Sequence, residues 1–120
     1  DKKFIIIDAG MNDWMRTALY DAQHEVVPIE KKQSKDSVET MIVGPICETT
    51  DQFISSREYF EVKEDEYLAI LNTGAYGSSM SSNYNVRPLI EEVMIDGNNY
   101  YKIRNRQKFE DLINKEIDID

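Results

Sequence analysis

Short apolar runs separated by polar breaks recur along this chain, and the pattern predicts more strands than helices. The first run, residues 4–7, is apolar at every position, which predicts a strand buried on both faces. Further strands are expected over residues 24–29, 38–43, 67–71, 90–95 and 100–104. Because the runs and their connections are short, we expect a mainly β fold, an antiparallel β barrel or sandwich with two short helices.

The two expected helices come from apolar residues at helical spacing. The first contains Trp14, Met15, Ala18, Leu19 and Ala22, and the second contains Phe109, Leu112 and Ile113. Asn12 or Asp13 can cap the first helix. Residues 51–60 have a mixed pattern that predicts neither element. The sequence predicts a charged link over residues 30–36 and a turn over residues 63–66. It also predicts a glycine-bounded loop over residues 72–77 and a hairpin turn over residues 96–99.

The size and charge of the chain exclude several classes of protein. Its 120 residues suffice for one domain with a modest core. The net charge is −9, from 23 acidic and 14 basic residues. Nucleic acids and anionic membranes bind clustered positive charge, so this balance argues against both as partners. No apolar run approaches the roughly 18 residues of a membrane-spanning helix.

The only cysteine, Cys47, cannot form an intrachain disulfide, which fits a reducing compartment such as the cytoplasm. No His/Cys pair has the spacing of metal ligands, so no metal site is expected. The segment Gly44-Pro45-Ile46-Cys47-Glu48 follows an apolar run, and Pro ends a strand because it has no N–H. Residues just past such a stop often face a cleft. The thiol can carry a proton and the carboxylate can bind an amine, although a lone Cys is more often buried and inert.

Two further groups of side chains suit ligand binding. Arg16 and Tyr20 are four positions apart and share one face of the first helix. A guanidinium and a phenol can together hold one carboxylate; the alternative is an Arg stem packed on a Tyr ring at a helix surface. Tyr76 lies between Gly74 and Gly77, which let the backbone approach a ligand closely; the alternative is a turn closed by an aromatic residue.

Four motifs follow one another along the chain. They are Asp8-Ala9-Gly10-Met11-Asn12-Asp13 with Arg16 and Ala18-Leu19-Tyr20, then Gly44-Pro45-Ile46-Cys47-Glu48, then Gly74-Ala75-Tyr76-Gly77, then Met80-Ser81-Ser82-Asn83-Tyr84-Asn85 with Arg87-Pro88. In this order they resemble the C-terminal part of diaminopimelate decarboxylases, from about residue 4 to about residue 112. Thr17 stands where that family usually has Pro, and Ser78 where an aromatic residue is more common.

The resemblance implies a pyridoxal 5'-phosphate enzyme of the alanine-racemase-like fold, with an N-terminal (β/α)8 barrel and a C-terminal β domain. Residues 1–120 correspond to the C-terminal domain, and the family's Schiff-base lysine belongs to the barrel, which is absent from this chain. The chain is therefore expected to be inactive alone and to work as a homodimer in the full-length enzyme. An isolated half is also expected to expose an unpaired sheet edge.

The resemblance further implies a role for each candidate residue. Arg16 and Tyr20 look like the grip on the distal carboxylate of meso-diaminopimelate, and Glu48 looks like the partner of its distal amino group. Cys47 looks like the residue that returns a proton to Cα after CO2 leaves, which yields L-lysine. Tyr76 looks like a contact to the cofactor, near its phosphate, and to the substrate. Cys47 and Glu48 are expected to reach into the active site of the partner subunit.

Two alternatives stay open. Decarboxylases of the same fold that act on polyamine precursors, such as ornithine, arginine or carboxynorspermidine, often carry Cys-Asp where this chain has Cys47-Glu48. The longer Glu side chain, together with Arg16, favours a substrate with both an amine and a carboxylate at its distal end. The second alternative is a non-catalytic β module for dimerisation or regulation, which needs neither the thiol nor the Arg16–Tyr20 pair.

Overall fold

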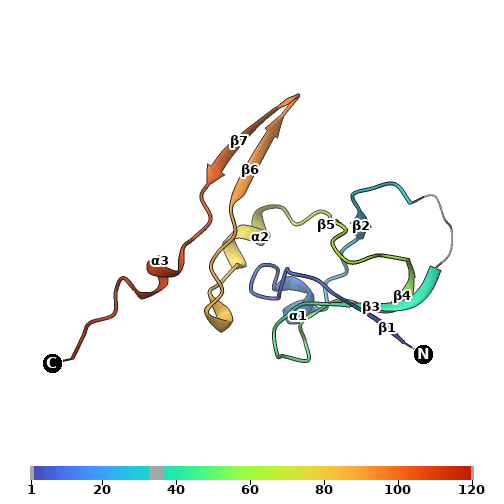
Figure 1. Ribbon diagram of the computed structural model, residues 1–120, viewed down its shortest axis with the longest axis horizontal. Coiled ribbons are helices and arrows are strands. Elements are labelled where there is room, and N and C mark those ends of the chain that lie inside the picture. The colour runs from blue at the N-terminus through green and yellow to red at the C-terminus, as the bar shows by residue number, and fades with distance from the viewer. Residues whose placement is uncertain (1, 33–36, 120) are drawn as a thin grey trace.

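The computed structural model describes residues 2–32 and 37–119 as a mainly β fold with short helices (Figure 1). The strands are β1 (Lys3–Ile6), β2 (Val26–Pro28), β3 (Ser37–Val43), β4 (Gln52–Phe60), β5 (Leu68–Ile70), β6 (Glu92–Asp96) and β7 (Asn99–Arg104). The helices are α1 (Arg16–Tyr20), α2 (Gly74–Met80) and α3 (Phe109–Ile113), with a short 3-10 helix, η1 (Tyr84–Val86). The predicted link over residues 30–36 lies partly outside the described residues.

Within the described residues the strands form three sheets, with the orders β1-β3-β4, β2-β5 and β6-β7. β1 pairs with β3 in parallel, with Phe4 opposite Met41, and the other pairs are antiparallel. The mainly β prediction is confirmed. The predicted barrel is wrong, because these sheets do not close on one another, and the described chain has three α-helices rather than two. A parallel pair needs a long crossover, which the lengths of the apolar runs do not reveal.

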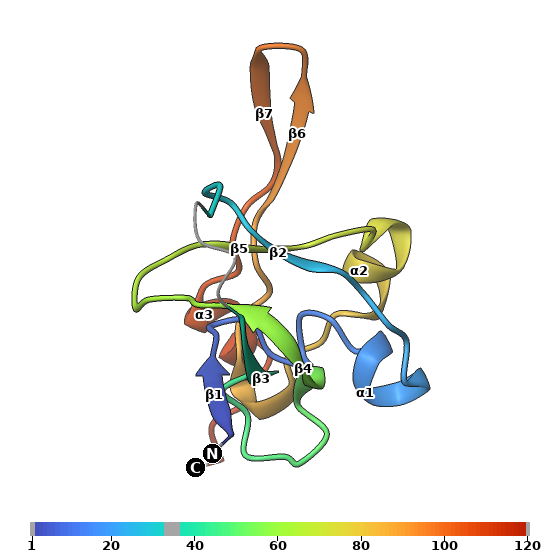
Figure 2. The ribbon, with the colours of Figure 1, turned by 90° about the vertical axis from the view of Figure 1, so that its right-hand side faces the viewer.

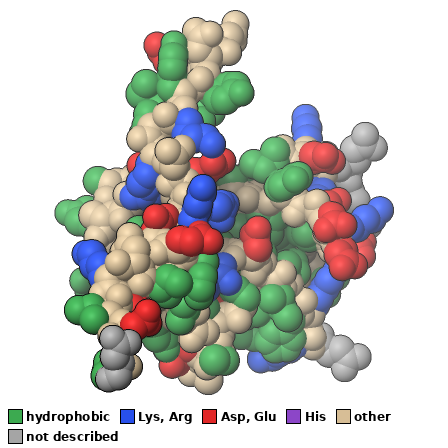
Figure 3. All heavy atoms as spheres, turned by 60° about the vertical axis from the view of Figure 1, so that its left-hand side comes forward, with side chains coloured by type: hydrophobic (Ala, Val, Ile, Leu, Met, Phe, Trp, Pro, Cys, Tyr) green, Lys and Arg blue, Asp and Glu red, His purple; other side chains and the backbone are tan. Residues whose placement is uncertain are grey.

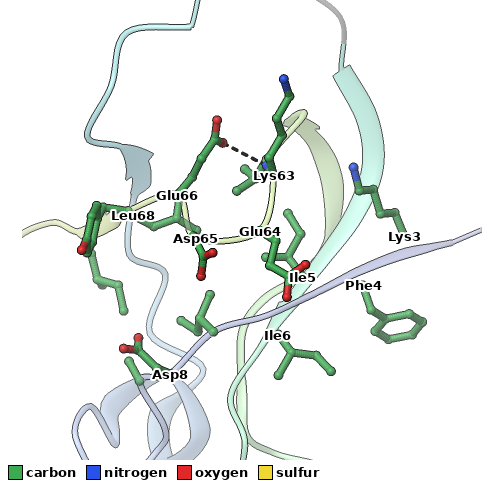
Figure 4. Close-up of a pocket in the computed structure, with 15 residues that line it drawn as sticks. Lys3, Phe4, Ile5, Ile6, Asp8, Lys63, Glu64, Asp65, Glu66 and Leu68 are labelled. Atoms are coloured by element: carbon green, nitrogen blue, oxygen red, sulfur yellow. Dashed lines mark hydrogen bonds between the residues drawn. The ribbon is translucent and has the colours of Figure 1, made fainter.

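β1 also differs from the strand buried on both faces that its apolar run predicts. Ile5 packs against the core, whereas Phe4 and Ile6 are 57% and 72% exposed. Figure 4 shows Ile5 on one side of the strand and Phe4 and Ile6 on the other. The reason is that the core covers only one face of β1, so its side chains alternate between core and solvent.

The hydrophobic core lies between the β1-β3-β4 sheet and the β2-β5 pair. Its buried members are Trp14, Val26, Ile42, Phe53, Ile54 and Tyr59. The Tyr59 hydroxyl donates a hydrogen bond of 2.9 Å to the Val26 carbonyl and so joins the two sheets. The indole of Trp14 meets the His24 ring edge-on, with centroids 4.6 Å apart. Trp14 thereby fixes the segment that leads into α1.

The β6–β7 hairpin projects from the rest of the molecule (Figures 1 and 2). Residues 96–99 close it as predicted, with Gly97 at a φ of 57°. Hydrophobic side chains lie on the hairpin, with charged side chains of both signs below it (Figure 3). Arg104 donates to the Ser78 hydroxyl at 2.7 Å and pairs with Glu92 at 2.8 Å, so the base of the hairpin is tied to α2.

Candidate functional site

The loop after β3 presents Cys47 and Glu48 to solvent. β3 ends at Val43, one residue before the Gly-Pro pair, as predicted from the loss of a backbone donor at Pro45. Ile46 is buried and anchors the loop, while the next side chain, Cys47, is a free, exposed thiol. The structure therefore places the thiol where it can meet a ligand or another subunit, and the alternative of a buried cysteine is wrong.

Glu48 has a carboxylate that is held in its ionised form. Its Oε1 accepts hydrogen bonds from the Thr50 backbone N–H at 3.4 Å and from the Thr49 hydroxyl at 3.2 Å. These donors, with the Thr50 N–H first, lower the pKa of Glu48 below its ordinary value of 4.5. The carboxylate is exposed and remains an anion at neutral pH, which suits it to bind an ammonium group.

Arg16, Tyr20 and Tyr76 come together on the surface formed by α1 and α2. The Arg16 guanidinium carbon lies 5.6 Å from the centre of the Tyr20 ring and 5.2 Å from that of Tyr76. No described carboxylate lies within ion-pair distance of Arg16. The guanidinium is thus positioned by two aromatic rings and still has donors for a ligand's carboxylate.

Two of the predicted local structures around this group are wrong. Tyr76 lies in the first turn of α2, not in a loop, so it is carried by a regular element. α1 begins only at Arg16, and neither Asn12 nor Asp13 caps it. Asp13 instead accepts a hydrogen bond from the Gly10 N–H at 2.9 Å and closes a separate turn before the helix. The preference of Asp for turns competed here with its preference for helix caps.

Packing of Trp14 against α2 explains how Tyr76 reaches Arg16. A side chain at Gly77 would lie 3.5 Å from the Trp14 ring, so α2 approaches the indole closely at this glycine. Because Trp14 is buried and lies two residues before Arg16, the same contact fixes the spacing of the two helices. A Cβ at Gly77 would make an ordinary van der Waals contact with the indole, so this packing does not itself require glycine.

Arg87, part of the last motif, stabilises the turn in front of α1. Its guanidinium donates to the Asp8 carbonyl at 2.5 Å and lies 3.8 Å from the Asp13 carboxylate. The Ser82 N–H also donates to the Asn12 carbonyl at 2.9 Å. The motif around residues 81–88 thus supports the segment that carries Arg16, a role that sequence alone did not reveal.

Asp51 is a further residue that the sequence analysis missed. It is only 2% exposed, and its two carboxylate oxygens accept hydrogen bonds from the backbone of two different segments. The signal available in the sequence was weak: an Asp between a Gly-Pro loop and the next strand is a common turn residue.

The five candidate residues form two separate groups. Arg16, Tyr20 and Tyr76 make one, and Cys47 with Glu48 makes the other. Within the described residues no hydrogen bond or ion pair joins the two groups. The cavities also lie elsewhere: a hollow of about 760 Å³ lies between β1 and the β4–β5 connection, and its lining includes none of the five (Figure 4). Each group is therefore an open, partial site on this chain.

The residues around α2 can contact a pyridoxal-type cofactor but cannot hold it covalently. The Tyr76 side chain is 60% exposed and its hydroxyl is a free donor. A cavity of about 680 Å³ beside α2 is lined by Trp14, Thr73, Ser78 and Arg104 among others, and no lysine is among its lining residues.

In the described part of the chain no cluster of three His, Cys, Asp or Glu side chains can hold a metal ion. No described helix is long and apolar enough to cross a membrane.

Comparison with known proteins connects these features. A family model described as the C-terminal sheet domain of pyridoxal-dependent decarboxylases matches residues 1–74. Diaminopimelate decarboxylase of Aquifex aeolicus is 47% identical over 118 residues, which are 98% of this chain and 28% of that relative. The chain thus spans little more than a quarter of the length of such relatives.

Two solved structures are similar to nearly the whole of this chain. A crystal structure of an Aquifex aeolicus protein is 46% identical with a TM-score of 0.91, over 97% of this chain and 28% of the other. The crystal structure of diaminopimelate decarboxylase from Helicobacter pylori complexed with L-lysine is 39% identical with a TM-score of 0.85, over 92% of this chain and 27% of the other.

Proposed function

This chain belongs to the family of C-terminal sheet domains of pyridoxal-dependent decarboxylases, and we propose that it is the C-terminal domain of a diaminopimelate decarboxylase. The proposed enzyme converts meso-2,6-diaminopimelate to L-lysine and CO2 in lysine biosynthesis. It would combine this domain with an N-terminal (β/α)8 barrel, in an alanine-racemase-like fold. The identity of 47% to the Aquifex aeolicus decarboxylase over nearly the whole chain supports the proposal.

The arrangement of Arg16 between two phenol rings carries the proposal. A planar guanidinium gives two parallel hydrogen bonds to one carboxylate, and the Tyr20 hydroxyl can add a third. The distal end of diaminopimelate bears such a carboxylate, whereas ornithine has none. Arg16 and Tyr20 would therefore select diaminopimelate over the polyamine precursors.

Glu48 would bind the distal ammonium group of the same substrate. Its lowered pKa keeps it ionised at neutral pH, and its exposure leaves the carboxylate free for a ligand. A guanidinium and a carboxylate that hold the two substituents of one carbon distinguish its configurations, because exchanging the substituents would oppose like charges. Arg16 and Glu48 would in this way recognise the L configuration of the distal centre, which becomes the Cα of the L-lysine product.

Cys47 would donate the proton that completes the reaction. When the bond from Cα to the carboxyl carbon breaks, its electron pair stays with Cα and accepts the proton of the thiol. Pyridoxal phosphate, held covalently by a lysine outside this chain, supplies the electron sink for that pair when bound. Tyr76 would contact the cofactor and the substrate from α2.

A homodimer would complete the site. Cys47 and Glu48 are exposed and make no described contact with Arg16, Tyr20 or Tyr76, so one chain offers two partial sites. In the proposed dimer, Cys47 and Glu48 of one subunit reach the site that contains Arg16 of the other. We expect the enzyme to act in the cytoplasm, where the Cys47 thiol stays reduced.

The experiment that tests the function measures CO2 release from meso-diaminopimelate with pyridoxal phosphate. It compares this chain alone with the chain behind its N-terminal barrel. We expect activity only in the longer protein. Activity on ornithine or arginine instead would favour a polyamine-pathway decarboxylase, and no activity on any of the three would favour a non-catalytic dimerisation module.

A further inference from the structure

We propose that Asp51 is a positioning residue that fixes the Cys47–Glu48 loop against the turn that leads to Arg16; this inference rests on the proposed function. Its Oδ1 accepts the Met11 N–H at 2.7 Å, and its Oδ2 accepts the Ile46 N–H at 2.8 Å. Met11 lies in the turn before α1, and Ile46 is the residue before Cys47. One carboxylate therefore joins the two segments that carry the two candidate groups.

The backbone of Asp51 closes the same loop. The Gly44 N–H donates to the Asp51 carbonyl at 2.9 Å, and the Asp51 N–H donates to the Glu48 carbonyl at 3.0 Å. Both ends of the loop thus converge on Asp51. Because Asp51 is only 2% exposed, water cannot easily take the place of its carboxylate as the acceptor for these backbone N–H groups.

Gly44 provides the space that the carboxylate occupies. A Cβ at this position would lie 2.2 Å from Asp51 Oδ2 and 2.5 Å from Oδ1, well inside van der Waals contact. Any side chain at Gly44 must therefore displace the carboxylate from Met11 and Ile46. The turn itself does not require glycine before Pro45, since Gly44 has no positive φ. The close approach of the Asp51 carboxylate gives the reason for glycine at this position.

The charge and shape of the carboxylate make it hard to replace. An ionised carboxylate accepts at both oxygens, and such bonds to backbone N–H groups are roughly twice as strong as neutral ones. Asparagine has the same shape but only one acceptor oxygen, so it must lose either the Met11 or the Ile46 bond. In the proposed dimer each active site uses Arg16 of one subunit and Glu48 of the other, and an Asp51 carboxylate positions each of them.

The test uses Asp51→Asn, Gly44→Ala and the control Asp96→Asn in the full-length enzyme. Asp96 is an exposed carboxylate of the β6–β7 hairpin, away from both groups. The readout is the ratio of kcat/KM for meso-diaminopimelate to that for the D,D isomer, which differs from it only at the distal centre. We expect this ratio to fall about tenfold or more in the first two variants, and to stay unchanged in Asp96→Asn.

A merely structural role predicts a different result. Loss of folded enzyme lowers the rate on both isomers equally and leaves their ratio unchanged, so an unchanged ratio in both Asp51→Asn and Gly44→Ala overturns the proposal. A wild-type enzyme without activity on either isomer would refute the proposed function instead.

Amide hydrogen exchange tests the positioning role without a substrate. In the full-length protein we expect the amide of Met11 or of Ile46, whichever loses its acceptor, to exchange about tenfold faster in Asp51→Asn than in the wild type. The Tyr59 amide, in the core strand β4, serves as the internal reference and should keep its rate. Unchanged exchange at both Met11 and Ile46 would overturn the proposal whatever the enzyme's substrate.

Discussion

The guanidinium of Arg16 lies 5.2 Å from the centre of the Tyr76 ring, although the two residues belong to different helices far apart in the sequence. The contact depends on Trp14, which packs against α2 at Gly77 and holds the two helices at this distance. It gives α1 and α2 a common surface where a ligand can meet a cation and two phenols.

Arg16→Lys tests the grip on the distal carboxylate. We expect kcat/KM for meso-diaminopimelate to fall about 10- to 100-fold, because an ammonium group cannot form the two parallel hydrogen bonds of the guanidinium. Arg57→Lys, at an exposed position of β4, is the matched control. Steady-state kinetics of the full-length enzyme gives the comparison, and equal losses in the two variants would contradict the assigned role.

Cys47→Ser tests the proton donor. A hydroxyl is a far weaker acid than a thiol, so we expect kcat to fall about 10²- to 10⁴-fold with little change in KM. The thermal unfolding midpoint should stay the same, because the Cys47 side chain is exposed and packs in no core. An unchanged kcat would show that the proton comes from another group.

Glu48 leads to a prediction about pH. A carboxyl whose pKa is lowered on folding stabilises the folded state above its unfolded pKa, and this contribution is lost as the pH falls through the folded pKa. For Glu48 that window lies below pH 4.5, so its charge should be constant across neutral pH. We expect Thr49→Val to move the pKa of Glu48 back toward 4.5, because it removes one donor.

NMR titration of the Glu side-chain carboxyl carbons measures this shift, with Glu48→Gln identifying the signal. An unchanged Glu48 pKa in Thr49→Val would contradict the hydrogen bond from the Thr49 hydroxyl.

Tyr59 gives the stability of the fold the opposite dependence on pH. Burial raises the pKa of its hydroxyl above 10.0, against a smaller lowering by Arg57. A raised folded pKa means that the stabilisation is present below the unfolded pKa and is lost as the pH rises through the folded one. Stability should therefore decline above about pH 10.

Tyr59→Phe should reduce the free energy of unfolding by about 1–3 kcal/mol, because the buried Val26 carbonyl loses its donor. It should also weaken the decline above pH 10. Tyr100→Phe, at an exposed tyrosine of the hairpin, should change neither quantity. Chemical denaturation at neutral and alkaline pH measures both, and equal curves for the two variants would refute the structural role of Tyr59.

The sequence predicted the local elements better than their arrangement. The hairpin over residues 96–99 followed from the Asp-Gly pair, whose conformational preference needs no tertiary contact. By contrast, the parallel pairing of β1 with β3 depends on a crossover, and apolar runs carry no information about strand direction. Exposure of Phe4 and Ile6 likewise depends on what covers the sheet, not on the strand itself.

For the candidate residues as well, neighbours in the sequence could be predicted and contacts between distant residues could not. Cys47 and Glu48 are neighbours in sequence, so their proximity was certain, while the contact of Arg16 with Tyr76 required the packing of Trp14 on Gly77. The role of Asp51 could not be predicted, because it depends on two backbone N–H groups whose positions the residue types do not reveal. Its space at Gly44 is visible only in three dimensions.

The parallel pairing of β1 with β3 sets the order in which the chain can fold. The β6–β7 hairpin joins neighbouring strands and can form within about 1–10 μs. β1 and β3 enclose α1 and β2 between them, so their pairing must close a much longer loop and comes later. Since Arg16 lies within that loop, we expect its surface with Tyr76 to assemble among the last events of folding.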